Sequence, residues 1–384
     1  MLPNQLQAAL ADLDAQGLLR RRRVLDGAQG ARVRVDGRDC LSFASNDYLG
    51  LAAHPAIAEA AARAAHEVGV GAGAAHLLTG HHRLHHVLEE MLADFVGLPA
   101  ALLFSTGYMA NLGVVQALLD RHGEVFEDRL NHASLVDAAL LSRAKLTRYP
   151  HLDLATLEQR LAASTARVKL IASDTVFSMD GDLAPVAELL ALAERHDAWL
   201  YLDDAHGFGV LGERGEGVAS RLPPHPSLIL LATLGKAAGV SGAFVAGGAD
   251  LIEWLVNRAR TYIYTTAQPP LLAAAVAASL RLIAGEPWRR RRLAELVARL
   301  KAGAAGLPWP LLASDTPIQP LLVGDSQAAL ALAEALRQRG ILIPAIRPPT
   351  VPSGAARLRI SLSAAHTEAD VDSLLAALRE AAKA

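Results

Sequence analysis

Short apolar runs that alternate with helical stretches constrain the fold of this sequence most. From about residue 83 onward, the runs that are typical of strands are ALLFST at 101–106, VKLIASD at 168–174, AWLYLDD at 198–204 and LILLATL at 228–234. This alternation indicates an α/β fold, a mostly parallel sheet covered by helices. Ligands of such sheets bind at the carboxyl ends of the strands. The runs end in polar or glycine residues, so we expect the functional site at that edge.

A change in sequence character after residue 284 predicts a second, smaller domain. With 384 residues, the chain exceeds the usual size of a single core. After GEPWRRRRLAELV and GLPWP, the runs PIQPLLVG and ARLRISLS flank helical patterns at 326–339 and 367–383. We therefore predict an N-terminal arm (1–45) with a helix over 3–19, a large α/β domain (46–284) and a small C-terminal α+β domain (285–384).

Composition and charge exclude several classes of partner. The formal net charge is −2, which gives no electrostatic reason to expect nucleic acid or a membrane surface. The first residues carry their charge run, Arg20 to Arg23, after the apolar positions, which is the reverse of a secretory signal. No uncharged apolar stretch approaches the roughly 18 residues of a membrane span. The single cysteine, Cys40, excludes an intrachain disulfide, fits a reducing cytoplasm and is expected to be a buried thiol.

The run LLATLGKAAGVSGAF places Lys236 directly after an apolar strand, beside Gly235 and close to Gly239 and Gly242. An amine on such a tight loop can reach a ligand. Schiff-base chemistry needs an amine that is neutral part of the time, and desolvation in a cleft lowers a lysine pKa toward that condition. Most lysines near glycine are simply exposed, so this pattern alone is weak.

The run WLYLDDAHGFG ends another strand with Asp203, Asp204 and His206. A carboxylate at a strand end can keep a pyridine nitrogen protonated, which makes pyridoxal an electron sink. The structural alternative is that Asp203 or Asp204 caps the next turn or helix. The motif alone leaves both interpretations open.

Two further segments could contact a cofactor. In FSTGYMANLG (104–113) a strand ends in a small-residue turn that opens a helix, where the backbone N–H groups of Gly107 and Tyr108 could bind phosphate. In LNHASLVDA, His132 precedes a helical pattern. That histidine could lie over a flat ring, or it could satisfy a local backbone group.

Other chemical motifs are weak in this sequence. HHRLHHVLEEML places His82 and His86 one helical turn apart, a spacing that could ligate zinc. Four histidines in six residues more often form a solvated helix start, so we expect no metal. GVGAGA at 69–74 follows a helical stretch and lacks the G-x-G-x-x-G spacing, and no G-x-S-x-G occurs.

Five ordered blocks carry a family resemblance: SNDYLG, NHAS, VFSMDGD, LDDAHG and TLGKAAGVSG. In order and spacing they resemble the α-oxoamine synthases, which are fold-type-I enzymes that use pyridoxal 5'-phosphate. The resemblance covers nearly the whole chain. It implies an acyltransferase that joins an amino acid to an acyl thioester with loss of carbon dioxide, and a homodimer with active sites at the subunit interface.

The resemblance also assigns roles to residues of this sequence. Lys236 corresponds to the lysine that holds the cofactor, Asp203 to the partner of the pyridine nitrogen, His206 to a contact of the phenolic oxygen, and His132 to the residue stacked on the ring. It implies further cofactor contacts from Gly107, Tyr108, Ser178, Thr233 and, for the phosphate of the neighbouring subunit, Thr266. Asp174 and His76 depart from the residues of other members, so no role follows for them.

The block IRPPTVPSGAARLRISLSAAHT at 346–367 is most similar to that of the member in biotin biosynthesis. This implies L-alanine and a pimeloyl thioester, carried by coenzyme A or by an acyl carrier protein, as substrates. The alternative is a family member that uses glycine or serine with another acyl-CoA. Arg359 resembles the arginine that takes the amino-acid carboxylate, with His132 and Thr350 as further substrate contacts. Arg20, the first of four consecutive arginines, resembles the one that meets the far carboxylate of the acyl chain.

Overall fold

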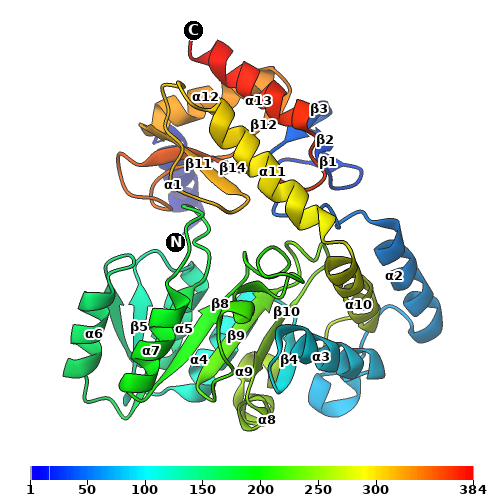
Figure 1. Ribbon diagram of the computed structural model, residues 1–384, viewed down its shortest axis with the longest axis vertical. Coiled ribbons are helices and arrows are strands. Elements are labelled where there is room, and N and C mark those ends of the chain that lie inside the picture. Colours follow the sequence, from blue (N-terminus) through cyan, green and yellow to red (C-terminus); the bar gives the residue numbers. More distant parts are fainter. Residues whose placement is uncertain (1, 17, 384) are drawn as a thin grey trace.

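A seven-stranded sheet forms the centre of the larger part of the computed structural model, which describes residues 2–16 and 18–383 (Figure 1). The strand order is β4-β10-β9-β8-β7-β5-β6. Only β10 runs antiparallel to its neighbours. The strands are β4 (Ala100–Phe104), β5 (Gly123–Asp128), β6 (Lys145–Tyr149), β7 (Val168–Asp174), β8 (Ala198–Asp203), β9 (Leu228–Thr233) and β10 (Ala243–Gly247). The expected α/β class is confirmed.

Both faces of this sheet are buried, which explains why its strands read as continuous apolar runs. Along β4, Ala101 and Leu103 pack into one hydrophobic cluster, whereas Leu102 and Phe104 pack into another. Helices from the connecting segments cover the two faces (Figure 1). The helices of the larger part are α2 (Pro55–Val68), α3 (Arg83–Val96), α4 (Gly107–Leu118), α5 (Ala133–Ser142), α6 (Leu154–Ala163), α7 (Val186–Arg195), α8 (Ala249–Arg258), α9 (Arg260–Ile263) and α10 (Pro270–Gly285), with the short helices η1 (His76–Gly80) and η2 (Gly217–Arg221). Of these, α2 packs on α10 instead of on the sheet.

The smaller part contains two further sheets. One has the order β11-β14-β13 and the other β1-β2-β3-β12. The strands are β1 (Leu25–Asp26), β2 (Arg32–Val35), β3 (Arg38–Ser42), β11 (Ile318–Gly324), β12 (Ile341–Leu342), β13 (Ala345–Ile346) and β14 (Ala356–Ser361); the helices are α1 (Pro3–Ala15), α11 (Trp288–Gly303), α12 (Ser326–Gln338) and α13 (Glu368–Ala381). Parallel pairing of β3 with β12 joins the N-terminal segment to the C-terminal part. The domain boundaries at 45 and 284 stay a prediction.

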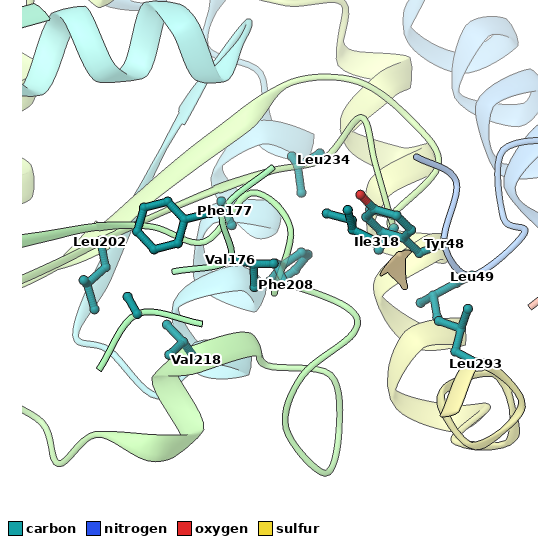
Figure 2. Packing of buried hydrophobic residues seen from close by; sticks show 14 of the residues in the cluster. Tyr48, Leu49, Val176, Phe177, Leu202, Phe208, Val218, Leu234, Leu293 and Ile318 are labelled. Atoms are coloured by element: carbon teal, nitrogen blue, oxygen red, sulfur yellow. The ribbon is translucent and has the colours of Figure 1, made fainter. Parts of the chain in front are cut away.

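One hydrophobic cluster extends from the large sheet into the smaller part. Figure 2 shows Phe177, Leu202 and Phe208 on the large-sheet side, and Tyr48, Leu49, Leu293 and Ile318 on the other side. All seven side chains are at most 3% exposed. Burial of such side chains stabilises each by roughly 1.5–3 kcal/mol, so the shared cluster fixes how the two parts meet.

Most expected elements are present, with one correction at the N-terminus. The four apolar runs form β4, β7, β8 and β9, and the two late helical patterns form α12 and α13. The expected helix over 3–19 ends at Ala15, and residues 18–20 are not helical. Gly17 follows in the sequence, and glycine is a poor helix former.

Two expectations about environment concern Cys40 and membrane spans. Cys40 is free and 7% exposed, packed with Val33 and Val35, so the expected buried thiol is confirmed. Within residues 2–16 and 18–383, no single helix is long and apolar enough to cross a membrane. The pair α10 and α11, bent by 67° at their junction, meets the criteria of length and composition only when taken together.

Candidate active site

Eight of the predicted site residues line one cavity at the carboxyl ends of the central strands. Its volume is about 180 Å³. The predicted residues in its wall are Gly107, Tyr108, His132, Ser178, Asp203, His206, Thr233 and Lys236. They lie at the last residues of β8 and β9 or in the segments that directly follow β4, β5, β7, β8 and β9. They therefore meet at the sheet edge that the alternation of runs predicted.

Lys236 lies on the tight loop between β9 and β10. Gly239 has φ +68°, and a Cβ there would lie 2.6 Å from backbone atoms of Leu51 and Ala52; only glycine lets the loop pack this closely. Nζ of Lys236 lies 2.8 Å from Nε2 of His206. Burial lowers the pKa of Lys236 to about 8, although the charges of Asp203 and Asp174 oppose the shift. The amine is therefore partly neutral near pH 8.

Asp203 and its neighbour Asp204 have different environments. Asp203 lines the cavity, and its Oδ2 accepts a hydrogen bond of 2.9 Å from Nδ2 of Asn111. Its Oδ1 accepts from the backbone N–H of Ala205 at 3.1 Å. Asp204 is fully buried elsewhere and accepts from the N–H of Val218 at 2.8 Å and from the hydroxyl of Thr175. Both carboxylates accept local backbone hydrogen bonds, but only Asp203 also faces the cavity.

A chain of hydrogen bonds fixes the orientation of Asn111 and His132. The hydroxyl of Tyr201 donates to Oδ1 of Asn111 at 2.7 Å, so Nδ2 points to Asp203 and to Oγ of Ser134. The hydroxyl of Ser134 then donates to Nδ1 of His132 at 2.7 Å. Burial lowers the pKa of His132. The ring is therefore neutral at pH 7 with its proton on Nε2.

His132 also begins a helix, which is the second of its two expected uses. It is the N-cap of α5, where Nδ1 accepts from the N–H of Ser134 at 3.3 Å. Its own N–H donates to Oδ2 of Asp174 at 3.0 Å. Asp174 is buried, and burial raises its pKa well above the usual range. His132 therefore lines the cavity, and the hydrogen bond to Asp174 fixes its backbone.

His206 connects the lysine to a buried arginine. The hydroxyl of Tyr48 lies 2.6 Å from Nδ1 of His206, and Nη2 of Arg359 donates to that hydroxyl at 3.3 Å. Arg359 also donates to the carbonyl of Ser178 and to side chains of Asn46 and Ser361. Burial lowers the pKa of His206 well below its usual value, with the positive charges of Lys236 and Arg359 adding to the shift.

The helix α4 begins at the cavity with Gly107. Its N-cap is Thr106, whose hydroxyl oxygen accepts from the N–H of Met109 at 3.1 Å. The first N–H groups of a helix have no partner within it, so those of Gly107 and Tyr108 are available to an anion, as the sequence indicated. Thr233 lies beside Gly107, because a Cβ on that glycine would be 4.0 Å from the Cβ of Thr233. The hydroxyl of Thr233 accepts from the N–H of Gly235 at 3.3 Å.

A larger cavity of about 740 Å³ adjoins the first one. The two share His132 and Ser178. Arg20 and Thr350, the predicted substrate contacts, line this second cavity. Thr266 lies apart from both, exposed and bridged to Ala75. Among the described residues, Arg359 lines neither cavity. It is connected to the site by its hydrogen bonds to the carbonyl of Ser178 and the hydroxyl of Tyr48.

The histidine-rich segment differs from the expected solvated helix start. His85 is fully buried; its Nδ1 accepts from the N–H of His82, and its Nε2 contacts the carbonyl of Gln268. That expectation is therefore wrong for His85, because the helix packs this side chain inward. His82 accepts from the N–H of Leu84 as the cap of α3. The nitrogen atoms of His76, His81 and His85 lie close together, as do ligand atoms of His81, His86 and Glu89, but both nitrogen atoms of His85 already have protein partners.

Sequence reasoning missed Asn111, Tyr48, Ser134 and Tyr201. Tyr48 lies within SNDYLG and Ser134 within NHAS, two blocks of the resemblance, but no local pattern links these residues to the site. Asn111 and Asp203 are 92 positions apart in the sequence. Contacts of this kind come from the strand order of the sheet, which apolar periodicity does not specify.

Residues 38–378 match the family description "Aminotransferase class I and II". Among similar proteins, the 8-amino-7-oxononanoate synthase of Nitrosomonas europaea is 64% identical over 382 residues, which covers 98% of this chain and 99% of that protein. The enzyme of the same name from Thiobacillus denitrificans is 62% identical over 379 residues, covering 98% of each.

Solved structures of two enzymes are similar to this chain over most of its length. A serine palmitoyltransferase from S. paucimobilis with a bound PLP–myriocin aldimine has a TM-score of 0.92 and 28% identity, covering 99% of this chain and 97% of that one. The 8-amino-7-oxononanoate synthase from Francisella tularensis has a TM-score of 0.79 and 29% identity, covering 90% of this chain and 98% of that one. By its full-length similarity and by the family match, the chain belongs to the aminotransferase class I and II family and, within it, to the 8-amino-7-oxononanoate synthases.

Proposed function

We propose that this protein binds pyridoxal 5'-phosphate at Lys236 and condenses L-alanine with a pimeloyl thioester, releasing carbon dioxide and 8-amino-7-oxononanoate for biotin biosynthesis. The names of the full-length relatives support the reaction. The single observation that carries the proposal is the cavity in which a lysine amine with a pKa of about 8 faces Asp203, His206 and His132.

The cavity residues fit the cofactor. Asp203 is a carboxylate held in place by Asn111 and Ala205, as a partner for a protonated pyridine nitrogen must be. The free N–H groups at the start of α4 suit a phosphate. His132 supplies a neutral ring for stacking, and Ser178 and Thr233 add polar contacts. When bound, pyridoxal phosphate acts as an electron sink for negative charge at the Cα atom of the amino acid.

Lys236 has two tasks in this proposal. Its neutral amine would hold the cofactor covalently, and the free amine would take the proton from the alanine Cα atom. The lowered pKa keeps part of the amine unprotonated for both tasks. His206, 2.8 Å from Nζ, orients the amine, and Tyr48 in turn holds Nδ1 of His206.

Arg359 is the proposed binder of the alanine carboxylate. A guanidinium group has five N–H donors, and four of those of Arg359 already bond to Ser178, Asn46, Ser361 and Tyr48. One N–H on Nη2 remains. Two-pronged binding of a carboxylate therefore requires displacement of one present contact. Tyr48, at 3.3 Å the longest of the four, is the easiest to displace.

The acyl substrate and the second subunit complete the proposal. The pimeloyl group lies in the 740 Å³ cavity, with Thr350 beside it and Arg20 toward its far carboxylate. Coenzyme A or an acyl carrier protein carries the thioester. The protein works as a homodimer in which Thr266 contacts the cofactor phosphate of the partner subunit. The reducing cytoplasm, which the single buried Cys40 fits, is the proposed compartment.

The test is an absorbance titration of the purified, cofactor-loaded protein with L-alanine, glycine and L-serine, followed by pimeloyl-CoA and mass analysis of the product. We expect alanine alone to change the spectrum strongly and the thioester then to yield carbon dioxide and 8-amino-7-oxononanoate. A response to glycine or serine instead would support the alternative family reaction. Absence of any cofactor band after loading would contradict the whole proposal.

A further inference from the structure

The larger cavity carries an excess of positive charge. Four arginines and two aspartates line it, beside apolar side chains that include Val136, Met179, Val351 and Pro352. The charged residues are Arg20, Arg129, Arg148, Arg357, Asp137 and Asp180. A cavity with apolar walls and unbalanced positive charge suits a ligand that has a methylene chain and an anionic end.

Arg357 does not contribute to this excess. Its Nη1 lies 2.5 Å from Oδ1 of Asp180, and its Nε donates to the carbonyl of Ala355. The other aspartate, Asp137, accepts a hydrogen bond from the hydroxyl of Tyr108. In contrast, Arg129 makes no ion pair with any residue in the described part of the chain. It also lies in this cavity only three positions before His132.

Arg148 is held beside Arg129 and is also uncompensated. Its Nη2 donates to the carbonyl oxygen of Arg129, and its Nε is buried without a hydrogen-bond partner. The residue that pairs with Arg148 across β5 and β6 is an acid, Glu127. Glu127 is fully buried, and neither of its oxygen atoms has a partner among the described residues. Burial raises the pKa of Glu127 to about 8, against the charge of Arg148, so this acid is neutral at pH 7.

We propose that Arg129 and Arg148 form a binding site for the distal carboxylate of the acyl chain and thereby select acyl substrates that end in a carboxylate. This inference rests on the proposed function and deepens it. Arg20 is the arginine that the family resemblance indicates for this carboxylate. The two arginines proposed here lie elsewhere: Arg129 in the loop that follows β5, and Arg148 in β6.

The position of the pair favours the acyl carboxylate over the phosphates of the carrier. Arg129 lies on the same short loop as His132, whose ring lines both cavities. A chain that starts at the reacting carbon beside His132 and extends along the apolar wall therefore ends inside this cavity. The coenzyme A or acyl carrier protein is bonded to the thioester sulfur, on the other side of the reacting carbon. Its phosphates therefore need not follow the apolar wall to the two arginines.

The experiment compares two substrates in three variants. Steady-state rates are measured for Arg129→Gln, Arg148→Lys and Arg148→Gln with two substrates. These are pimeloyl-CoA and heptanoyl-CoA, which has the same chain length with a methyl group in place of the distal carboxylate. A charge-assisted hydrogen bond contributes about 1.5–3 kcal/mol, equivalent to roughly 10- to 100-fold in affinity. We expect Arg129→Gln and Arg148→Gln to raise KM for pimeloyl-CoA by about tenfold or more, and KM for heptanoyl-CoA by less than about twofold. Arg148→Lys should recover part of the loss.

Two controls separate the possible causes. Arg63→Gln removes an exposed charge on α2 and should leave both KM values unchanged. The short thioester S-pimeloyl-N-acetylcysteamine lacks the carrier phosphates; the penalty in Arg129→Gln should persist with it. If the penalty disappears with the short thioester, the arginines bind the carrier and the inference is wrong. Equal losses with both acyl-CoA substrates also overturn it. Failure of the wild-type protein to condense alanine with any thioester would contradict the proposed function instead.

Discussion

At the scale of single residues, the neighbouring carboxylates Asp203 and Asp204 show how the strand pleat separates chemistry from structure. Successive side chains of a strand point to opposite faces. At the end of β8, Asp203 therefore lines the cavity, and Asp204 is enclosed by Thr175 and Val218. Burial raises the pKa of Asp204 to about 7. The sequence motif DD offers two candidate carboxylates for the cavity, and the alternation of side chains along the strand places only Asp203 there.

This difference predicts opposite results for two matched substitutions. In the proposed function, the carboxylate of Asp203 would keep the pyridine nitrogen protonated. Asp203→Asn removes that carboxylate, so we expect kcat to fall by at least about 100-fold with the fold intact. Asp204→Asn makes the same change one residue later and should leave kcat within about threefold. Steady-state kinetics and circular dichroism test both variants. Comparable loss of kcat in the two would exclude the assigned role of Asp203.

Glu127 predicts a pH-dependent stability effect. Its pKa in the folded state, about 8, lies above the ordinary glutamate value of 4.5, which applies to the unfolded chain. The folded state therefore holds a proton that the unfolded state has lost, and this group reduces stability progressively as pH rises from about 4.5 to 8. Glu127→Gln removes that loss. We expect the variant to be more stable than the wild type by a few kcal/mol at pH 8 and by much less at pH 5, since each pKa unit corresponds to about 1.4 kcal/mol.

Urea unfolding midpoints of Glu127→Gln and wild type at pH 5, 6.5 and 8 measure this effect. Glu90→Gln, on an exposed glutamate of α3, is the matched control and should show no such trend. A difference in stability that does not grow with pH would mean that Glu127 is ionised, in which case the charge of Arg148 would be balanced within the protein.

At the scale of elements, His151 joins two loops that carry site residues. Its Nδ1 lies 2.9 Å from Oδ1 of Asp128 at the end of β5, and its Nε2 lies 2.7 Å from Oδ2 of Asp182. Asp128 also accepts the backbone N–H groups of Leu130 and Leu152. The loop of Asp182 contains Ser178, and the loop after Asp128 contains His132. The imidazole therefore holds two walls of the cavity together.

His151→Gln should loosen this connection. Burial lowers the pKa of His151, but hydrogen bonds and charges of Asp128 and Asp182 outweigh burial and raise it to about 10. A pKa above the usual 6.5 contributes stability that is fully present below pH 6.5 and is lost as pH rises through 10. We expect the variant to be less stable by a few kcal/mol at pH 6, with a smaller difference at pH 10. Thermal unfolding across this range tests the sign, with the exposed His122→Gln as control. A stability difference that widens toward pH 10 would be inconsistent with a charged His151.

The elements also define what the sequence could predict. The runs that became β7, β8 and β9 are long, apolar and buried on both faces, so their pattern is clear. β5 and β6 were not among the expected strands, because GEVFED contains three acidic residues and KLTRY, the strand at the sheet edge, contains two basic residues, Lys145 and Arg148. These two strands carry Glu127 and Arg148. The sequence therefore predicted the larger cavity less clearly than the cavity of Lys236, whose residues follow recognisable strands.

At the scale of the whole molecule, exposed apolar side chains make up a patch on the segments next to Thr266 and its bridge partner Ala75, and Thr266 lies apart from both cavities. Val70, Leu77, Leu78 and Tyr264 are 71%, 49%, 77% and 71% exposed. Thr266 bridges to Ala75 in the same region, and α9 contacts η1 there. Large apolar side chains gathered on a surface indicate a protein interface. If a second subunit covers this patch, Thr266 lies next to the cavity of that subunit, as the proposed shared site requires.

Leu78→Asp tests this arrangement. A buried unpaired carboxylate at the interface is strongly unfavourable, so we expect the variant to sediment as a monomer and to lose most of its activity and cofactor affinity together. Trp254→Asp places the same charge on an exposed apolar side chain of α8 and should leave the dimer and the activity intact. Analytical ultracentrifugation and cofactor titration measure the two effects. A monomeric Leu78→Asp variant with full activity would show that each subunit has a complete site, and Thr266 would then have no part in binding the phosphate of the partner.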